Sequence, residues 1–499
     1  MSAMFSPAKE LLATLSDLAE TTRTSACAPG LGLSVFTADE VLLERGFGAR
    51  DREAGLPVTP ETIFGVASIT KSFTALTTLT LQERDELRLA DGVRRYFDFG
   101  PLWAEGAVPR VEHFLSHSSG LPPTPSMTWL RYASQVDDHV AARPTLEEAK
   151  LTLVPGVMGM QPGRLTLARL DAAAKALEDE EARLRLTALA ADVADFEGLA
   201  AWLGENAAPL ADPGELYSYS NDAFCLVGGM IERVTGGAFA DAVAREVLAP
   251  LGMRRSGFDA ASVMADADHS TLYTRDAEGA VLRSPAWQTT GVMQGGGMLK
   301  STLADLRTYV RHLMCGGPHV RAMTEVRVAS APGAAYGLGL AIIEDHHGLR
   351  VVKHGGSLKG VSSAIGFVPE LGVGVVVLCN LDGVPAEQLL MRVVNACAGL
   401  PLTAAVYDPE PITPALSDVK AVLGDYLSGE PYGRLRLYLG AAGDLRAGVG
   451  WPEVDVPAFF AGRDEVALAY PDSRTAVTLL RDGHGAVWGA RSGRVMLRL

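Results

Sequence analysis

A serine and a lysine three positions apart, Ser68 and Lys71, form the first pattern in the chain that could do chemistry. On a helix, residues i and i+3 lie on one face, so the hydroxyl and the amine can touch. A neutral amine there can accept the hydroxyl proton, and a protonated one can stabilise a neighbouring phenolate. The spacing therefore predicts a serine nucleophile at the start of a helix over residues 68–81.

The same spacing recurs at Ser417 and Lys420, so the pattern is not sufficient by itself. Ser68 follows the largely apolar residues 64–67, and after it apolar residues recur at helical intervals without Pro or Gly. Ser417 follows the Pro-rich segment 407–414. We therefore predict that Ser68 is the nucleophile and that Ser417 lies in a surface helix or turn.

Tyr219 and Asn221, two positions apart, form the second pattern. A tyrosine can act as a general base when cations stabilise its phenolate. The asparagine amide offers donors and an acceptor to Lys71 and to a substrate amide. The alternative is a core tyrosine followed by an asparagine that caps a helix over 223–234. Tyr217 competes for the role of base, but only Tyr219 has an asparagine two residues later.

The third pattern follows a strand predicted over residues 349–353 and consists of His354, Gly355, Gly356 and Ser357. Paired glycines let a substrate backbone approach a strand closely. The backbone N–H of Ser357 could join that of Ser68 in an oxyanion hole. His354 would present a polar or cationic group to the reacting residues or to a substrate carboxyl. Taken alone, the pattern fits a glycine turn with an exposed histidine better.

Together, the three patterns resemble the serine β-lactamase-related family, which includes class C β-lactamases, penicillin-binding carboxypeptidases, D-aminopeptidases and family VIII carboxylesterases. β-Lactamases and penicillin-binding proteins carry S-x-x-K, S-D-N and K-T-G. Here Y-x-N and H-G-G occupy the places of the last two. H-G-G is more usual in the esterase and peptidase branches. The likeness spans roughly residues 25–400 and includes the segments 115–122, 250–253 and 295–306.

The resemblance implies roles for the residues that match it. Ser68, Lys71, Tyr219 and His354 would be catalytic. Asn221, Gly355, Gly356 and Ser357 would bind substrate or its oxyanion. No metal or organic cofactor is implied. His117 would be structural rather than a partner of Ser68.

These residues require elements that bring them together. We predict strands at 32–36, 41–47, 349–353, 362–368 and 374–379, and helices at 6–22, 68–81 and 385–397, with a mostly helical middle. Strands at both ends with helices between them favour an α+β domain in which an antiparallel sheet flanked by helices meets an all-helical region. The site would lie at their junction.

Two segments stand apart from this domain, which we assign to residues 1–404. Residues 130–205 are rich in Ala, Leu, Glu and Arg, and they predict a helical insertion that is a lid, a decoration or a subunit contact. Residues 405–499 follow the Pro-rich linker and alternate as short strands do. They predict a small all-β module, which resembles the lipocalin-like barrel of some D-aminopeptidases.

The composition of the chain argues against some classes of binding partner. A net charge of −15 and a pI near 5.2 argue against binding to nucleic acid or anionic membranes. The five cysteines are scattered without metal-ligand or disulfide spacing. Residues 1–20 hold three acidic side chains and no sustained apolar core, so we expect a cytoplasmic protein, although a chain with its signal removed would look the same.

The patterns predict a serine hydrolase that forms an acyl-enzyme at Ser68. The favoured substrate is the amide of a short peptide, with or without D-residues. A carboxylesterase, a β-lactamase and a catalytically silent binding protein are the alternatives, in that order. The expected partner is a small molecule or a short peptide, and assembly as a homo-oligomer is left open.

Overall fold

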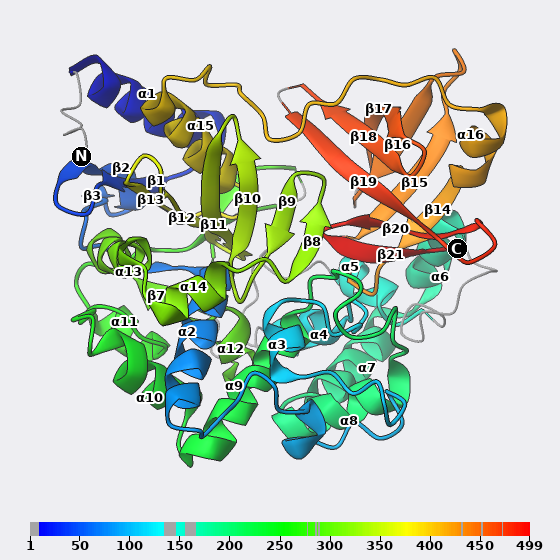
Figure 1. Ribbon diagram of the computed structural model, residues 1–499, viewed down its shortest axis with the longest axis horizontal. Helices are drawn as coiled ribbons and strands as arrows, with labels where there is room; N and C mark the ends of the chain where they lie inside the picture. The colour runs from blue at the N-terminus through cyan, green and yellow to red at the C-terminus, as the bar shows by residue number, and fades with distance from the viewer. Residues whose placement is uncertain are drawn as a thin grey trace.

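A computed structural model of the protein describes residues 9–133, 146–154, 166–276, 278–284, 287, 290–430, 433–450, 453–471 and 473–499. Parts of the predicted insertion, 134–145 and 155–165, lie outside these residues. Figure 1 shows a sheet covered by helices, a helical region beneath it, and a β-barrel beside both.

A nine-stranded antiparallel sheet has the order β3-β2-β1-β13-β12-β11-β10-β9-β8. Its strands are β1 (Gly30–Phe36), β2 (Val41–Asp51), β3 (Leu56–Pro57), β8 (Val328–Ala331), β9 (Ala334–Tyr336), β10 (Ala341–His346), β11 (Leu349–Leu358), β12 (Val361–Val368) and β13 (Val373–Cys379). β1 pairs with β13, with Leu31 opposite Cys379, so the sheet joins the two ends of the catalytic part as predicted. The three strands β8–β10 were not predicted.

Helices cover both faces of this sheet (Figure 1). α1 (Lys9–Ser25) and α15 (Ala386–Ala398) pack on one face, and α13 (Leu303–Cys315) packs on the other. Every residue of β1 and β13 is buried as a result. A strand buried on both faces reads as an apolar run rather than an alternation, which is why these two strands were readily predicted.

The helical region lies below the sheet. Its elements are η1 (Ala67–Ile69), α2 (Thr70–Glu83), η2 (Val93–Arg95), α3 (Val111–Leu115), α4 (Ser126–Ala133), α5 (Leu146–Leu151), α6 (Leu167–Ala176), α7 (Asp179–Asp192), α8 (Phe196–Asn206), α9 (Asn221–Thr235), α10 (Phe239–Val243), α11 (Ala260–Ala265), α12 (Gln294–Gly297) and α14 (Pro318–Thr324). Two short antiparallel pairs accompany them, β4 (Phe64–Gly65) with β7 (Lys300–Ser301) and β5 (Tyr273–Arg275) with β6 (Val281–Arg283).

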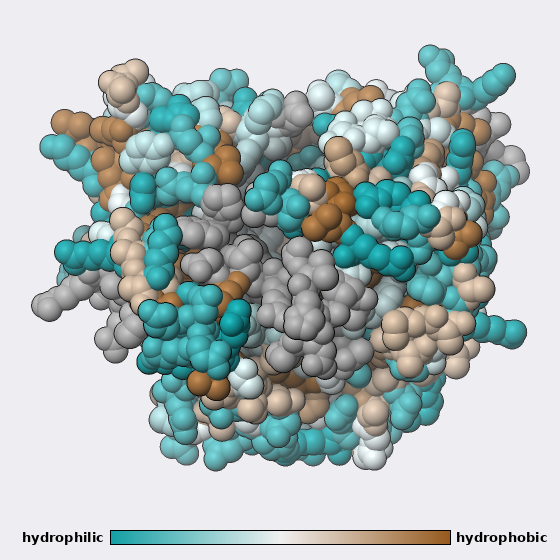
Figure 2. Space-filling model, turned by 180° about the vertical axis from the view of Figure 1, so that it is seen from behind, coloured by the Kyte–Doolittle hydropathy of each residue, from teal (hydrophilic) through white to brown (hydrophobic). Residues whose placement is uncertain are grey.

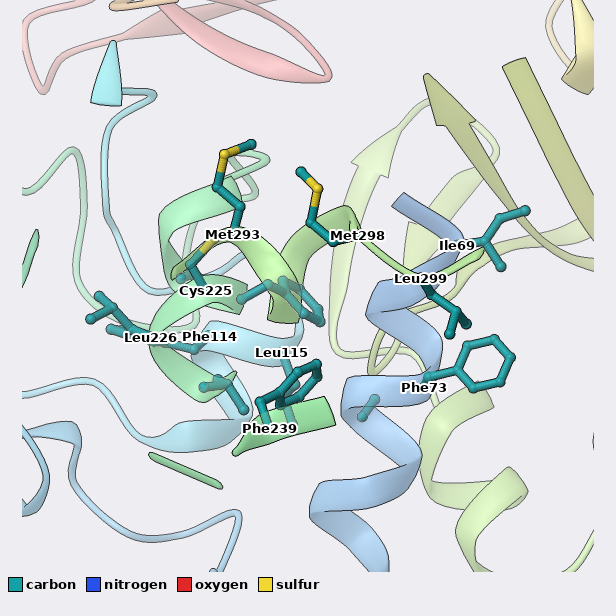
Figure 3. Packing of buried hydrophobic residues seen from close by; sticks show 14 of the residues in the cluster. Ile69, Phe73, Phe114, Leu115, Cys225, Leu226, Phe239, Met293, Met298 and Leu299 are labelled. Carbon is teal, nitrogen blue, oxygen red and sulfur yellow. The ribbon is translucent and has the colours of Figure 1, made fainter. Parts of the chain in front are cut away.

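α2 is buried along most of its length. Figure 3 shows Phe73 of α2 and Ile69 just before it in the same cluster as Cys225 and Leu226 of α9 and Phe239 of α10. The helix also carries hydroxyl side chains, and those of Thr70, Ser72, Thr74 and Thr78 all donate to backbone carbonyls. Because buried hydroxyls are costly without a partner, these bonds allow α2 to run through the core.

The C-terminal module is a closed eight-stranded barrel. Helix α16 (Leu416–Val422) precedes it, and its strands are β14 (Gly424–Leu427), β15 (Arg434–Leu439), β16 (Leu445–Val449), β17 (Val454–Gly462), β18 (Glu465–Tyr470), β19 (Ser473–Arg481), β20 (Val487–Ser492) and β21 (Arg494–Arg498). The prediction of a small all-β module is confirmed. Closure could not be predicted, because it depends on the pairing of β14 with β21, far apart in the chain.

The described helices of the insertion support the barrel and the helical region. A small cluster joins Leu167 and Leu170 of α6 to Leu427 and Leu499 of the barrel. Beside it, Arg434 of β15 forms an ion pair of 2.8 Å with Asp171. α7 packs on α4 and α5. The acidic run at its start, residues 178–181, is exposed, and Asp179 pairs at 2.5 Å with the buried amine of Lys150.

The face shown in Figure 2 is largely hydrophilic where it is coloured, with apolar side chains scattered over it. Within the described ranges, no single helix is long and apolar enough to span a membrane; a bent pair, Asn221–Thr235 with Phe239–Leu248, meets that test only in combination.

Candidate active site

Ser68 lies in the 3₁₀ turn η1, which leads directly into α2, and not in the first turn of one continuous helix as predicted. The preceding residue, Ala67, has a φ of +48°, a conformation that side chains other than glycine rarely adopt. The Thr70 hydroxyl donates to the Ala67 carbonyl at 2.6 Å and helps to hold this turn. Such strain, of order 1–3 kcal/mol, is typical of functional sites.

The Lys71 amine is fully buried and has three oxygen neighbours. Its Nζ lies 2.9 Å from Asn221 Oδ1, 2.7 Å from the Gly296 carbonyl and 3.1 Å from Ser68 Oγ. The first two oxygens can only accept, so two amine protons are committed to them. The remaining position on the nitrogen, a third proton or a lone pair, faces the Ser68 hydroxyl.

Three consecutive glycines allow Gly296 to reach Lys71. A Cβ on Gly295 would lie 2.4 Å from the Phe224 carbonyl and 3.2 Å from the Cα of Gly228, so α12 crosses α9 at close range only because both residues are glycines. In the sequence, the segment 295–298 was marked only by its resemblance to the family. Its physical role is to place a carbonyl oxygen on the Lys71 amine.

Tyr219 and Asn221 reach Lys71 from the start of α9. Ser220 is the N-cap, and its hydroxyl accepts from the N–H of Ala223 at 3.2 Å. Because Ser220 takes the capping role, the Asn221 side chain is available for Lys71. The Lys71 Nζ also lies 4.8 Å from the centroid of the Tyr219 ring. Tyr217 lies in the same cleft, but burial raises its pKa well above the usual range.

His117 packs against the same tyrosine. Its ring stacks on Tyr219 with centroids 4.0 Å apart, and its Nδ1 accepts the Ser220 N–H at 3.0 Å. Burial, reinforced by the charge of Lys71, lowers the pKa of His117 well below the usual range. The ring therefore supports the Tyr219 segment as a neutral group, in line with the structural role expected for it.

His354 is buried between two partners. Its Nδ1 lies 2.6 Å from the Gly355 carbonyl, and its Nε2 lies 2.8 Å from the Tyr336 hydroxyl. Since a carbonyl oxygen only accepts, Nδ1 carries the proton and Nε2 accepts from Tyr336. Burial and the nearby Lys71 charge lower the pKa of His354 to about 4. At neutral pH it is a polar, uncharged group, and the cationic alternative is not supported.

The H-G-G-S segment forms the second half of β11, so it is neither a turn nor exposed at His354. On one side it pairs with β12, from His354 opposite Ile365 to Leu358 opposite Val361. On the other side, β10 begins opposite Lys353, so the described strands leave this edge of β11 open. A Cβ on Gly356 would lie 2.3 Å from the Val66 carbonyl, so glycine is required for β11 to pass beside the Ser68 turn.

All these parts border one cleft of about 550 Å³. It is lined by Ser68, Tyr217, Tyr219, Tyr336, Ala341, the segment 354–357, Ser362, Ser363, the segment 383–388 and Arg494. The structure therefore brings Ser68, Tyr219, His354, Gly355, Gly356 and Ser357 to one surface. Lys71 and Asn221 lie just behind it. No described residue of the insertion lines the cleft, whereas the barrel contributes Arg494.

Sequence reasoning missed three side chains of this cleft. Tyr336 arrives through β9, and Glu387, on α15, carries a carboxylate that pairs with Lys353 beside Gly355. Arg494 arrives from the barrel, and its guanidinium lies 4.8 Å from the Tyr219 ring centroid. Nothing in the local sequence around these residues marks them, because each is brought in by long-range pairing.

A serine, a lysine and a tyrosine at the junction of an antiparallel sheet and a helical region define the class of serine β-lactamase-like and penicillin-binding-protein-like proteins. The Beta-lactamase family model matches residues 15–398. The chain therefore belongs to the Beta-lactamase family of serine hydrolases. The fold predicted from the sequence is confirmed.

The similar proteins include an esterase and a D-aminopeptidase. The chain is 32% identical over 228 residues to esterase EstB of Burkholderia gladioli, covering 44% of each protein. It is 26% identical over 412 residues to a D-aminopeptidase of Gluconobacter oxydans, covering 81% of this chain and 63% of that one. These alignments thus span less than two thirds of either relative.

Several solved structures are similar along nearly the whole chain, including the barrel. One of them is an octameric penicillin-binding protein homologue from Pyrococcus abyssi, with a TM-score of 0.62 and 25% identity over 97% of this chain and 99% of that one.

Proposed function

We propose that this protein forms an acyl-enzyme at Ser68 and hydrolyses the amide bonds of short peptides. The observation that carries the proposal is the position of the Lys71 amine. It is buried, 3.1 Å from Ser68 Oγ and 2.9 Å from Asn221 Oδ1, beside the Tyr219 ring and at the base of an open cleft.

In the proposed first step, Ser68 Oγ attacks the substrate carbonyl carbon. Its proton passes to the Tyr219 phenolate, which Lys71 stabilises, and the carbonyl oxygen becomes an oxyanion held by the N–H groups of Ser68 and Ser357. The C–N bond then breaks, and Tyr219 returns the proton to the leaving amine. Water attacks the acyl-enzyme by the same route, which releases the acid and restores Ser68 Oγ–H.

His354 has a positioning role in this scheme. Both of its ring nitrogens are hydrogen-bonded, one to the Gly355 carbonyl and the other to the Tyr336 hydroxyl. His354 thereby keeps the Tyr336 hydroxyl from competing with Tyr219 for the role of base. Because its pKa is near 4, it carries no charge at neutral pH.

The open edge of β11 favours a peptide. A peptide can bind to an exposed strand edge through main-chain hydrogen bonds, and the segment from His354 to Ser357 offers such an edge beside Ser68. The likeness to the Gluconobacter D-aminopeptidase, which covers 81% of this chain, supports the same choice. Esterase activity is the second candidate, since the match with esterase EstB has the higher identity.

A covalent probe tests the proposal. An uncharged fluorophosphonate should modify Ser68, and peptide mapping should find no adduct on Ser417, which lies on α16 with the same S-x-x-K spacing. Ser68→Ala and Tyr219→Phe should each lower turnover by ~10³-fold or more, without additivity in the double variant, because nucleophile and base act as a unit. An adduct on Ser417, or none with any acylating probe, would refute the mechanism.

A substrate panel then separates the two candidates. We expect a higher kcat/KM on D- or L-aminoacyl amides and short peptides than on p-nitrophenyl esters of matched acyl groups, after correction for the faster uncatalysed reaction of the esters. A preference for esters on this corrected scale would favour the carboxylesterase. Self-association stays a prediction; the octamer is a property of the Pyrococcus protein.

A further inference from the structure

The barrel hairpin between β20 and β21 is bound to the chain segment that carries the tyrosine of the cleft. Gly493, at the turn, has a φ of +72°, and its carbonyl accepts the Tyr219 N–H at 3.1 Å. Two residues later, the N–H of Val495 donates to the Ser218 hydroxyl at 3.4 Å. The backbone on both sides of Arg494 is therefore anchored to residues 218–219.

Arg494 projects from this hairpin into the cleft. Its guanidinium carbon lies 4.8 Å from the Tyr219 ring centroid, the same distance as the Lys71 amine. A cation within about 6 Å of an aromatic ring is attracted to it, more strongly when both are shielded from water. Tyr219 thus has two cations beside its ring, one from the helical region and one from the barrel.

Glu430 holds Arg494 in place and links it to the rest of the site. Its carboxylate pairs with Arg494 Nε at 2.7 Å and has only 11% of its side chain exposed. The same carboxylate accepts from Asn221 Nδ2 at 3.5 Å, which leaves Asn221 Oδ1 turned toward Lys71. Two charged residues of the barrel are therefore continuous with the hydrogen bonds around the catalytic amine.

We propose that Arg494 is a positioning residue for the base, which fixes the Tyr219 ring and stabilises its phenolate while the Ser68 proton is transferred. This inference rests on the proposed function, because it assigns Arg494 a part in the same proton transfer. It makes the barrel a component of the active site.

A second use of an arginine in a cleft is to bind a substrate carboxylate. Two observations favour the positioning role. The charge of Arg494 is already balanced by Glu430, and the hairpin is bonded to the backbone of Tyr219 itself. The two roles make opposite predictions for a substrate that has no carboxylate.

The test measures the rate at which an uncharged fluorophosphonate labels Ser68 in the full-length protein. Arg494→Met should lower the maximal labelling rate by about 3- to 10-fold, the range expected for loss of a partly exposed cation from an aromatic base. The probe's apparent affinity should change by less than about threefold.

Three variants serve as controls. Arg494→Lys should recover most of the rate, because it keeps the charge. Arg494→Gln is a second neutral variant, to be used if the unfolding temperature of Arg494→Met is lower than that of the wild type. Arg491→Met removes an arginine from the same hairpin. Arg491 donates to the Ala329 carbonyl and does not line the cleft, so this variant should be labelled at a rate within about twofold of the wild type.

The outcomes separate this inference from the proposed function. Absence of Ser68 labelling in the wild type would overturn both. Wild-type labelling together with an unchanged rate in both neutral Arg494 variants would overturn this inference alone. So would an equal loss in Arg491→Met, or a loss that appears only as weaker affinity for carboxylate-bearing substrates.

Discussion

The helical insertion and the C-terminal barrel are both additions to the catalytic fold, yet they differ in their relation to the cleft. The insertion lies in sequence between the helix of Lys71 and the loop of Tyr219, and so was the natural candidate for a lid. None of its described residues lines the cleft. The barrel begins about two hundred residues after Tyr219, and it supplies Arg494 together with two hydrogen bonds to residues 218–219.

The difference shows that proximity in sequence to a catalytic motif does not predict proximity in space. The insertion affects the cleft only indirectly, through the barrel, because α6 packs on the barrel and Asp171 of α6 pairs with Arg434 of the barrel. A lid built from the whole insertion stays a prediction, since 134–145 and 155–165 lie outside the described residues. In the described part, the insertion supports the barrel, and the barrel supports the segment that carries Tyr219.

Removal of the barrel should have the largest effect on this comparison. A chain that ends at residue 404 loses Arg494, Glu430 and the carbonyl that accepts the Tyr219 N–H. We expect turnover of a short peptide amide to fall by ~100-fold or more, because the base loses both its second cation and its backbone anchor. Steady-state kinetics of the truncated and intact proteins would measure this.

A nicked protein provides the control. Limited proteolysis should cut the linker 407–414, which the structure describes as irregular chain before α16. If the barrel remains bound after the cut, activity should be retained. A truncated protein that melts cooperatively and keeps full turnover would show that the barrel is an accessory and that Arg494 is dispensable.

The parts of the site that could be predicted are those set by local spacing. Ser68 and Lys71 are brought together by a single helical turn, and Tyr219 and Asn221 by the entry to one helix, so these four residues of the candidate site could be named from short patterns. The buried strands β1 and β13 could be predicted for a similar reason, since an apolar run is visible without knowledge of its partners.

The rest depends on pairing between distant segments. His354-Gly355-Gly356 looked like a turn because glycine is a poor strand former, but pairing with β12 and the close passage of the Ser68 turn keep it extended. Tyr336 enters the cleft only because β9 pairs with β10. Arg494 enters only because the barrel closes and docks, which no local pattern encodes.

A substitution at the contact between insertion and barrel should have an intermediate effect. Leu170 of α6 is 2% exposed and packs in the cluster that includes Leu427 of the barrel. Leu170→Ala should lower the free energy of unfolding by about 3 kcal/mol, as for other buried leucines, and should speed cleavage of the linker 407–414. Urea denaturation and the rate of proteolysis would measure both.

The matched control is Leu184→Ala on α7. Leu184 has 65% of its surface exposed, so its removal should change stability by less than about 0.5 kcal/mol and leave proteolysis unchanged. Equal effects of the two substitutions would contradict the view that the insertion supports the barrel at Leu170.

The smallest expected effect concerns Asp222, where a barrel charge acts on the catalytic half. Burial raises the pKa of Asp222 from 3.8 to about 6, Glu430 of the barrel adds to the rise, and hydrogen bonds from Ser126 and Thr124 oppose it. Between pH 3.8 and 6 the folded state therefore binds more protons at this site than the unfolded state does. Its contribution to stability grows as the pH falls through this window and is absent above about pH 6.

His354 acts in the opposite direction. Its pKa is lowered from 6.5 to about 4, so the unfolded state binds more protons between these values, and stability falls as the pH drops from 6.5 toward 4. In the wild type, the gain at Asp222 offsets part of this loss. The offset depends on a carboxyl group at position 222 that can take up a proton.

Asp222→Asn should remove the offset. Between pH 6 and pH 4.5 the wild type gains about 1.5 kcal/mol from Asp222, because the full slope of about 1.4 kcal/mol for each pH unit is reached only below pH 6, and the variant should lose that amount relative to it over the same interval. Urea denaturation of both proteins at several pH values across this range would give the difference.

The stability change of Glu430→Gln over this pH range should lie between those of the wild type and Asp222→Asn. It removes the barrel's share of the rise in the pKa of Asp222 and leaves the share that comes from burial. If Asp222→Asn and the wild type lose stability in parallel as the pH falls, Asp222 is ionised throughout. If Glu430→Gln alone has no effect, the barrel's charge does not reach this residue, and its influence on the catalytic half is limited to the contacts around Tyr219 and Asn221.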